Sequence, residues 1–127
     1  MKKIIALLLL ALACVSCQAQ SDGTRLVSPD VFQTQIASKK VQLIDVRTPK
    51  EFRQGHLEGA RNIHLYEQDF ASQIGKLNKK ETVYVYCKAG GRSAEAVEIM
   101  KNSGFENIVE LDGGTDSWAA SGKPLVQ

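Results

Sequence analysis

The chain has few cysteines, and the part expected to fold has only one. Of the three cysteines in 127 residues, Cys14 and Cys17 lie in an apolar N-terminal segment, which leaves Cys87 alone. A single thiol can form neither an internal disulfide nor a cysteine-rich metal site, so both kinds of structural cross-link are excluded. We therefore expect Cys87 to be either an inert buried thiol or a reactive one.

The chain also lacks an excess of either charge. Without Lys2 and Lys3 of the N-terminal segment, 14 basic residues face 14 acidic ones. A domain that binds nucleic acid needs a basic surplus to neutralise phosphates, so we expect no nucleic-acid partner. No internal repeat or low-complexity tract is present, and the length suffices for one domain. We expect a monomer that needs no cofactor and no metal.

The one long apolar run is too short to cross a membrane. Residues 4–13 are continuously apolar, whereas a spanning helix needs about 20 such residues. The basic Lys2 and Lys3 precede this run, and small and polar residues follow it. This order is typical of a secretory signal peptide, so we expect an exported protein.

Two ways of processing the signal peptide are compatible with the sequence. Cleavage after residues 1–19 would release a soluble protein, whereas cleavage after residues 1–16 would leave lipid on Cys17. Residues 12–14 also resemble a lipobox, which would place the lipid on Cys14 instead. We favour lipid on Cys17, because small Ser16 precedes this cysteine and a polar tether follows it. The folded domain is then expected over residues 20–127, in the periplasm or cell envelope, with the membrane reached only through the lipid.

The most informative segment is the sequence Cys-Lys-Ala-Gly-Gly-Arg-Ser at residues 87–93. It directly follows residues 82–86, where alternating β-branched and aromatic residues predict a buried strand. Residues 93–100 predict a helix, with Val97 and Met100 on one face. Glycines at such a turn let successive backbone N–H groups point inward, which forms an anion-binding concavity. The helix N-terminus adds positive potential that favours thiolate over thiol, so we interpret Cys87 as a nucleophile.

The pattern Cys-x-x-Gly-x-Arg-Ser after a strand resembles the active loop of rhodanese-like sulfurtransferases. Three further segments match the family in order: Asp-Val-Arg-Thr-Pro-Lys-Glu-Phe at residues 45–52, Gly-His-Leu-Glu-Gly-Ala at residues 55–60, and Leu-Asp-Gly-Gly at residues 111–114, followed by Trp118. The match covers about residues 24–125. The resemblance implies a single α/β domain, in which a five-stranded, mostly parallel sheet has helices on both faces.

The patterns along the chain agree with that fold class. Apolar runs that predict strands alternate with segments whose apolar residues have helical spacing. Such alternation predicts a parallel sheet that binds its ligand at the carboxyl ends of strands, where Cys87 lies. The expected strands cover residues 41–46, 60–65, 82–86 and 107–111. The expected helices begin at Ser28-Pro29, at the Thr48–Glu51 capping box, at Phe70 (ending at Leu77), at Ser93 and after Gly113-Gly114.

The resemblance also implies roles for individual residues. Cys87 is the expected catalytic residue, and Arg92 is expected to close the loop and to hold an anionic substrate with its forked guanidinium. Asp45 and Arg47 are interpreted as a structural brace, although Arg47 could also face the entering anion. The expected substrate-binding residues are Lys88, Ala89, Gly90, Gly91, Arg92 and Ser93.

The length of the loop favours sulfur transfer over phosphate chemistry. Six residues run from Cys87 to Arg92, as in sulfur-transferring members of the superfamily, whereas the related phosphatases have a longer loop. The resemblance thus implies a thiosulfate sulfurtransferase that passes sulfane sulfur through a Cys87 persulfide to cyanide or a thiol, including a protein thiol. A persulfide carrier or redox-sensing domain is the alternative, and a phosphatase or arsenate reductase is less favoured. His56 is interpreted as a packing residue, and His64 receives no role.

Overall fold

The computed structural model describes residues 22–37 and 40–127. The expected signal peptide, its two expected cleavage sites and Cys17, the expected site of lipid attachment, lie outside these residues. Within the described part of the chain, no helix is long and apolar enough to cross a membrane.

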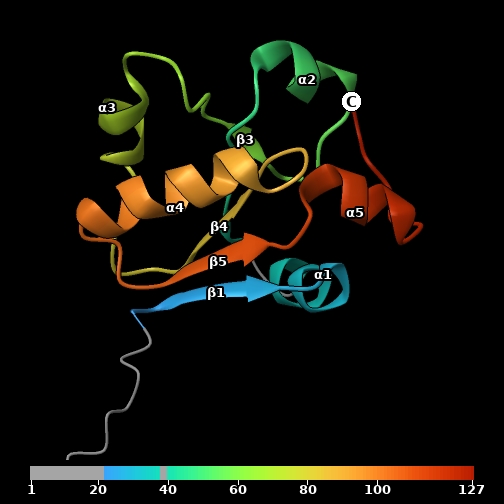
Figure 1. The fold of residues 1–127 in the computed structure, drawn as a ribbon, viewed down its shortest axis with the longest axis horizontal. Coiled ribbons are helices and arrows are strands. Elements are labelled where there is room, and N and C mark those ends of the chain that lie inside the picture. The colour runs from blue at the N-terminus through green and yellow to red at the C-terminus, as the bar shows by residue number, and fades with distance from the viewer. Residues whose placement is uncertain (1–21, 38–39) are drawn as a thin grey trace, which may run out of the picture.

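The described chain forms a five-stranded sheet with helices on both sides (Figure 1). The spatial order of the strands is β1-β5-β4-β2-β3, and every neighbouring pair is parallel, which confirms the expected α/β class. The strands are β1 (Thr24–Val27), β2 (Gln42–Asp45), β3 (Arg61–Asn62), β4 (Val83–Tyr86) and β5 (Ile108–Leu111), and the helices are α1 (Pro29–Ala37), α2 (Pro49–Gln54), α3 (Phe70–Ile74), α4 (Gly91–Asn102) and α5 (Gly114–Ala120).

The sheet separates two apolar cores. Side chains alternate between the faces of a strand, so in β2 Leu43 joins one core and Ile44 joins the other. The first core contains Val97 and Met100 of α4 together with the α3 side chains, and the second contains Phe32 of α1 and Trp118 of α5. Because both faces are covered, the central strands are mostly apolar, as parallel strands usually are, and their charged residues are Asp45 at the end of β2 and Glu110 in β5.

The expected elements are largely confirmed, with differences at the edges of the sheet. Strand β1 was not predicted, because its two central residues, Arg25 and Leu26, are both exposed and the strand shows no alternation of buried and exposed positions. Strand β3 is limited to Arg61–Asn62 instead of residues 60–65, since it pairs only with the last two residues of β2. Edge strands with one neighbour carry a weak sequence signal for this reason.

The helix after β2 begins as its sequence predicts. The Thr48 hydroxyl accepts the Glu51 backbone N–H at 3.2 Å, and the Glu51 carboxylate accepts the Thr48 backbone N–H at 3.4 Å. These two bonds are the capping box, with Pro49 at the first helical position. The box fixes the Glu51 carboxylate at the start of α2, from which it reaches the loop that follows β4.

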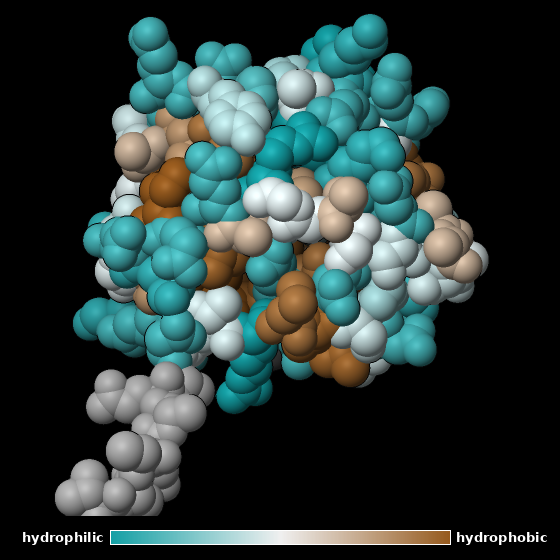
Figure 2. Space-filling view, viewed as in Figure 1, coloured by the Kyte–Doolittle hydropathy of each residue, from teal (hydrophilic) through white to brown (hydrophobic). Residues whose placement is uncertain are grey.

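The face of the molecule seen in Figure 2 carries mainly hydrophilic side chains. Its apolar residues form small, separate groups between polar ones, without a wide apolar patch. The large apolar side chains that are exposed among the described residues are Leu26, Val31, Tyr66 and Leu125. Scattered residues of this kind are normal on a protein surface.

Candidate active site

Cys87 lies directly after β4, at the carboxyl end of a central strand. The residue is only 1% exposed, and its Sγ accepts the backbone N–H of Gly90 at 3.0 Å. Gly90 has a φ of +117°, a backbone conformation that side chains disfavour, and it caps the N-terminus of α4. Gly91 already belongs to the helix and has no positive φ. Of the two adjacent glycines, therefore, only Gly90 is needed for the turn that directs an N–H group at the sulfur.

The N-terminus of α5 holds the first part of this loop from outside. The backbone N–H groups of Thr115 and Asp116 donate to the carbonyl oxygens of Cys87 and Lys88, at 2.9 and 3.0 Å. These bonds satisfy the two carbonyl oxygens and hold this part of the loop against α5. The Gly113-Gly114 segment before these residues has no side chains, which makes this close approach possible.

Gly114 is expected to tolerate no side chain. Its φ is +59°, and a Cβ atom there would collide with the carbonyl oxygens of Cys87 and Lys88. We expect Gly114→Ala to lower the free energy of unfolding by roughly 2–4 kcal/mol, through the left-handed backbone and the collision together. Gly59→Ala is the matched control, because Gly59 has a φ of +84° with open space around it. In urea denaturation, the free energy of unfolding of Gly59→Ala should fall by about 1–2 kcal/mol. Equal decreases in Gly59→Ala and Gly114→Ala would contradict the predicted collision.

A chain of hydrogen bonds leads from the sulfur into the protein. Cys87 Sγ lies 3.4 Å from the Ser93 hydroxyl, which in turn lies 2.6 Å from Oε2 of Glu110. The same hydroxyl lies 3.1 Å from the carbonyl oxygen of Gly90. Ser93, expected from the sequence as a substrate-binding residue, connects the thiol to a buried carboxyl group.

Sequence reasoning missed Glu110 as a site residue. The signal was available, because Glu110 is the one charged residue in a run predicted to be a strand buried on both faces. A charged side chain in such a strand must be paired, hydrogen-bonded or functional.

Arg92 points its guanidinium at Glu51 of α2. Nη1 and Nη2 donate to the two carboxylate oxygens at 2.6 and 2.9 Å, which is a forked ion pair. The capping box and this pair share one carboxylate, so α2 and the loop are tied together through Glu51. The guanidinium that was expected to hold an anion is thus already engaged by a carboxylate.

The ion pair between Glu51 and Arg92 should make the free energy of unfolding depend on pH in the acid range. The pKa of Glu51 is lowered to about 2, chiefly by the hydrogen bonds from Arg92. Its ionised form thus stabilises the folded state above the ordinary pKa of 4.5, and this contribution is lost as the pH falls through about 2. Because the side chain is 25% exposed, solvent screening reduces the loss to roughly 1–3 kcal/mol between about pH 5 and pH 2.

Urea denaturation at a series of pH values measures this loss. Glu51→Gln cannot ionise, so it should lack this component of the acid dependence. Glu58→Gln, the same change at an exposed position, should retain it. An unchanged acid dependence in Glu51→Gln would contradict the assignment.

Lys88 is an exposed cation that already has a partner. Its Nζ lies 2.9 Å from Oδ1 of Asp116, and the two side chains are 58% and 53% exposed. Pairs this exposed contribute little to stability, and either side chain can leave the pair easily. Lys88 therefore lies beside the loop but is not fixed over the sulfur.

Asp45 and Arg47 form a buried ion pair at the end of β2. Nη2 of Arg47 donates to Oδ2 of Asp45 and to the Gly55 carbonyl oxygen, both at 2.6 Å. The Tyr86 ring lies under the guanidinium, with its centroid 5.8 Å from Cζ. This network links the strand end to the chain after α2. A shallow hollow of about 160 Å³ lies beside it, lined by Arg47, Glu51, Gln54, Gly55, Lys88, Thr115 and Leu125.

The histidines and the tryptophan take part in packing. His56 Nδ1 donates to the Phe52 carbonyl oxygen at 2.8 Å, and the two rings stack with centroids 3.7 Å apart. His64 lies 3.3 Å from the Glu67 carboxylate. Trp118 is buried, and its indole N–H donates to the Pro124 carbonyl oxygen. Among the described residues, neither histidine hydrogen-bonds to Cys87.

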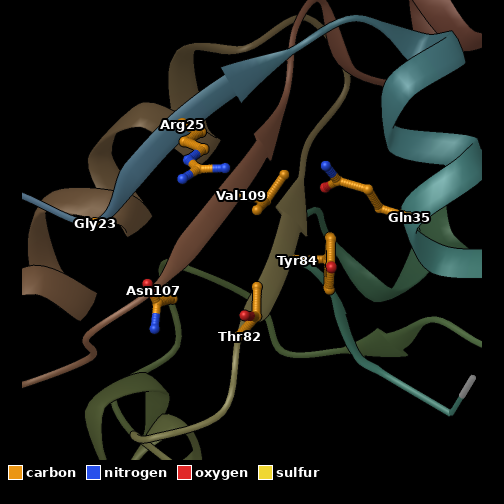
Figure 3. A pocket seen from close by; sticks show the side chains of 7 residues that line it. All are labelled: Gly23, Arg25, Gln35, Thr82, Tyr84, Asn107 and Val109. Carbon is orange, nitrogen blue, oxygen red and sulfur yellow. The ribbon is translucent and has the colours of Figure 1, made fainter. Parts of the chain in front are cut away.

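A larger hollow lies on the opposite side of the sheet from α4. It measures about 360 Å³, and Arg25 of β1 and Gln35 of α1 point into it from two sides (Figure 3). The remaining lining residues are Gly23, Thr82, Tyr84, Asn107 and Val109. Its lining is mainly polar and includes no cysteine, so this hollow is separate from the loop that holds Cys87.

Comparison with known proteins agrees with this geometry. A model of the family described as Rhodanese-like domain matches residues 28–121. The Mycobacterium tuberculosis protein named Probable adenylyltransferase/sulfurtransferase MoeZ is 39% identical over 88 residues, which are 69% of this chain but 22% of that protein. Thiosulfate sulfurtransferase 16 of Arabidopsis thaliana, a chloroplast protein, is 34% identical over 91 residues, which are 64% of this chain and 76% of that protein.

A solved structure has the same fold. The crystal structure of a rhodanese-related protein from Thermoplasma volcanium superposes with a TM-score of 0.70 and 29% sequence identity. The match covers 80% of this chain and 97% of the other chain.

Proposed function

Because the chain belongs to the Rhodanese-like domain family, we propose that it is a sulfurtransferase that carries sulfur on Cys87. The relatives named as sulfurtransferases support this general activity. We further propose thiosulfate as the donor, and cyanide or a thiol as the acceptor. The short loop from Cys87 to Arg92 supports a small sulfur donor.

The proposed reaction has two displacement steps. The Cys87 thiolate attacks the outer sulfur of thiosulfate, a new S–S bond forms, and the old S–S bond breaks with its electron pair leaving on sulfite. The acceptor then attacks the outer sulfur of the persulfide, which restores the Cys87 thiolate and releases thiocyanate or a persulfide of the acceptor thiol. No external oxidant is needed, because a sulfane sulfur atom passes from sulfite to Cys87 and then to the acceptor, and each displacement breaks one S–S bond as it forms one new bond to sulfur.

The observation that carries the proposal is the environment of Cys87 Sγ. The sulfur is buried, receives the Gly90 N–H at 3.0 Å and lies at the N-terminus of α4. A fixed donor of this kind stabilises a negatively charged sulfur without reorganisation. The same position would favour both the attacking thiolate and the resulting persulfide anion.

Initial-velocity kinetics test the two-step reaction. With thiosulfate and cyanide varied together, double displacement predicts parallel lines in reciprocal plots, because sulfite leaves before cyanide binds. Intersecting lines would require both substrates to be bound at once and would contradict a free persulfide intermediate. Turnover without any effect of Cys87→Ala would contradict the proposed function itself.

A further inference from the structure

Glu110 is a carboxyl group in an otherwise apolar environment. The residue is 8% exposed, and it is paired with Val85 in the β4–β5 register. Its side chain lies on the same face of the sheet as Ile108, the face that α4 covers. Within the described part of the chain, no cation lies within salt-bridge distance of it. Burial raises the pKa of Glu110, and the negative charge of Asp112 raises it further. Together these effects outweigh the hydrogen bond from Ser93, which lowers the pKa. Burying a carboxylate without a counter-ion is costly.

The hydrogen-bonding partner of Glu110 connects it to the reactive sulfur. Oε2 lies 2.6 Å from the Ser93 hydroxyl, and that hydroxyl lies 3.4 Å from Cys87 Sγ. Three different elements supply these atoms: the end of β4, the first turn of α4, and β5. Both Ser93 and Cys87 are buried, so the connection is shielded from solvent.

The hydroxyl of Ser93 can hold this chain in two arrangements. A hydroxyl has one hydrogen to donate and two lone pairs to accept with. In the first arrangement the Cys87 thiol donates to Ser93, and Ser93 donates to the Glu110 carboxylate. In the second, a protonated Glu110 donates to Ser93, and Ser93 donates to the Cys87 thiolate. The heavy atoms need not move between the two arrangements.

We propose that Glu110, acting through Ser93, accepts the proton of Cys87 and so generates the thiolate inside the protein. The proton on Sγ moves to Ser93 Oγ as the hydroxyl hydrogen moves to Oε2, so one proton is transferred, and no electrons are exchanged with another molecule. Glu110 is thus a positioning residue for the proton, while Cys87 remains the group that touches the substrate. The role in sulfur transfer rests on the proposed function, but the proton coupling itself does not.

The proposal has a distinctive consequence for titration. Two negative charges in this small, dry space oppose each other, so Cys87 and Glu110 should lose their two protons in separate steps. Between the steps the pair holds one proton, and the fraction of thiolate does not change with pH. The other charged or titratable groups that act on the pair are Asp112 after β5, Arg92 in α4 and Tyr66 between β3 and α3.

Alkylation with iodoacetamide reads the thiolate directly, without any sulfur donor. The rate of Cys87 alkylation, followed from acid to alkaline pH by the mass of the peptide that contains Cys87, should rise in two steps with a plateau between them. Glu110→Gln keeps a hydrogen-bonding group beside Ser93 but cannot take the proton, so its rate should rise in one step. Glu106→Gln, the same change at an exposed residue, should keep the two steps of the natural sequence.

Each outcome supports or overturns the proposal. A single step in the unaltered protein overturns it, even where Glu110→Gln fails to fold. Two steps that persist unchanged in Glu110→Gln also overturn it, because another group would then be the partner. A two-step profile in a protein that transfers no sulfur would leave the proton coupling standing and would reject the proposed function instead.

Discussion

Cys87→Ser is expected to abolish sulfur transfer while leaving the fold intact. Serine is close to cysteine in size, so the 1% exposed site should accept it with little change in stability. Its hydroxyl, however, does not ionise near neutral pH and cannot hold a second sulfur as a persulfide. We expect turnover of thiosulfate and cyanide to fall by roughly 10⁴-fold or more, as when the nucleophile of an enzyme is removed.

The control for this variant is replacement of the two remaining cysteines. Cys14 and Cys17 precede the expected folded domain of residues 20–127, so changing both to serine should leave turnover near that of the unaltered protein. Circular dichroism and urea denaturation establish that Cys87→Ser is folded. Turnover within a factor of a few in the folded variant would contradict a covalent intermediate at this position.

Arg92→Ala is expected to have the second largest effect. The guanidinium lies in the first turn of α4, close enough to Cys87 for the two charges to interact, and in the proposed reaction it would stabilise the negative charge of the departing sulfite. We expect kcat/KM for thiosulfate to fall by about 10²-fold or more, comparable to the removal of one oxyanion donor. Arg92→Lys should recover only part of the loss, because an ammonium group cannot make the forked contact.

Two further variants separate the charge of Arg92 from its ion pair with Glu51. Arg53→Ala removes an exposed arginine and should change kcat/KM little. Glu51→Gln breaks the ion pair but leaves Arg92 cationic, so we expect a loss below about tenfold, less than for Arg92→Ala. Equal losses in Glu51→Gln and Arg92→Ala would show that Arg92 acts only by bracing the loop.

The central strands, the capping box and the position of Cys87 could be predicted from sequence because local rules determine them. Strand β4 alternates β-branched and aromatic residues, and the Thr48–Glu51 spacing defines a helix start by itself. Glycine is the residue that most easily adopts a positive φ, so a glycine between strand β4 and helix α4 indicates the turn found at Gly90. Each of these features depends on residues close together in the chain.

The remaining features depend on contacts between distant segments. Arg92 meets Glu51 across 41 positions of sequence, and Lys88 meets Asp116 across 28, so neither partner was visible from local spacing. Strand β1 is an edge strand that hydrogen-bonds to β5, which lies more than 80 positions away in the sequence. Charge pairing of this kind changed the interpretation of Arg92 from a free anion-binding group to one that is held by a carboxylate.

The central claim is that Cys87 carries the transferred sulfur, and intact mass spectrometry tests it most directly. After incubation with thiosulfate and removal of excess reagent, the protein should gain the mass of one sulfur atom on the peptide that contains Cys87. Cyanide should then remove that mass and release thiocyanate, and Cys87→Ser should never gain it. No gain in the unaltered protein, or an equal gain in Cys87→Ser, would contradict the account.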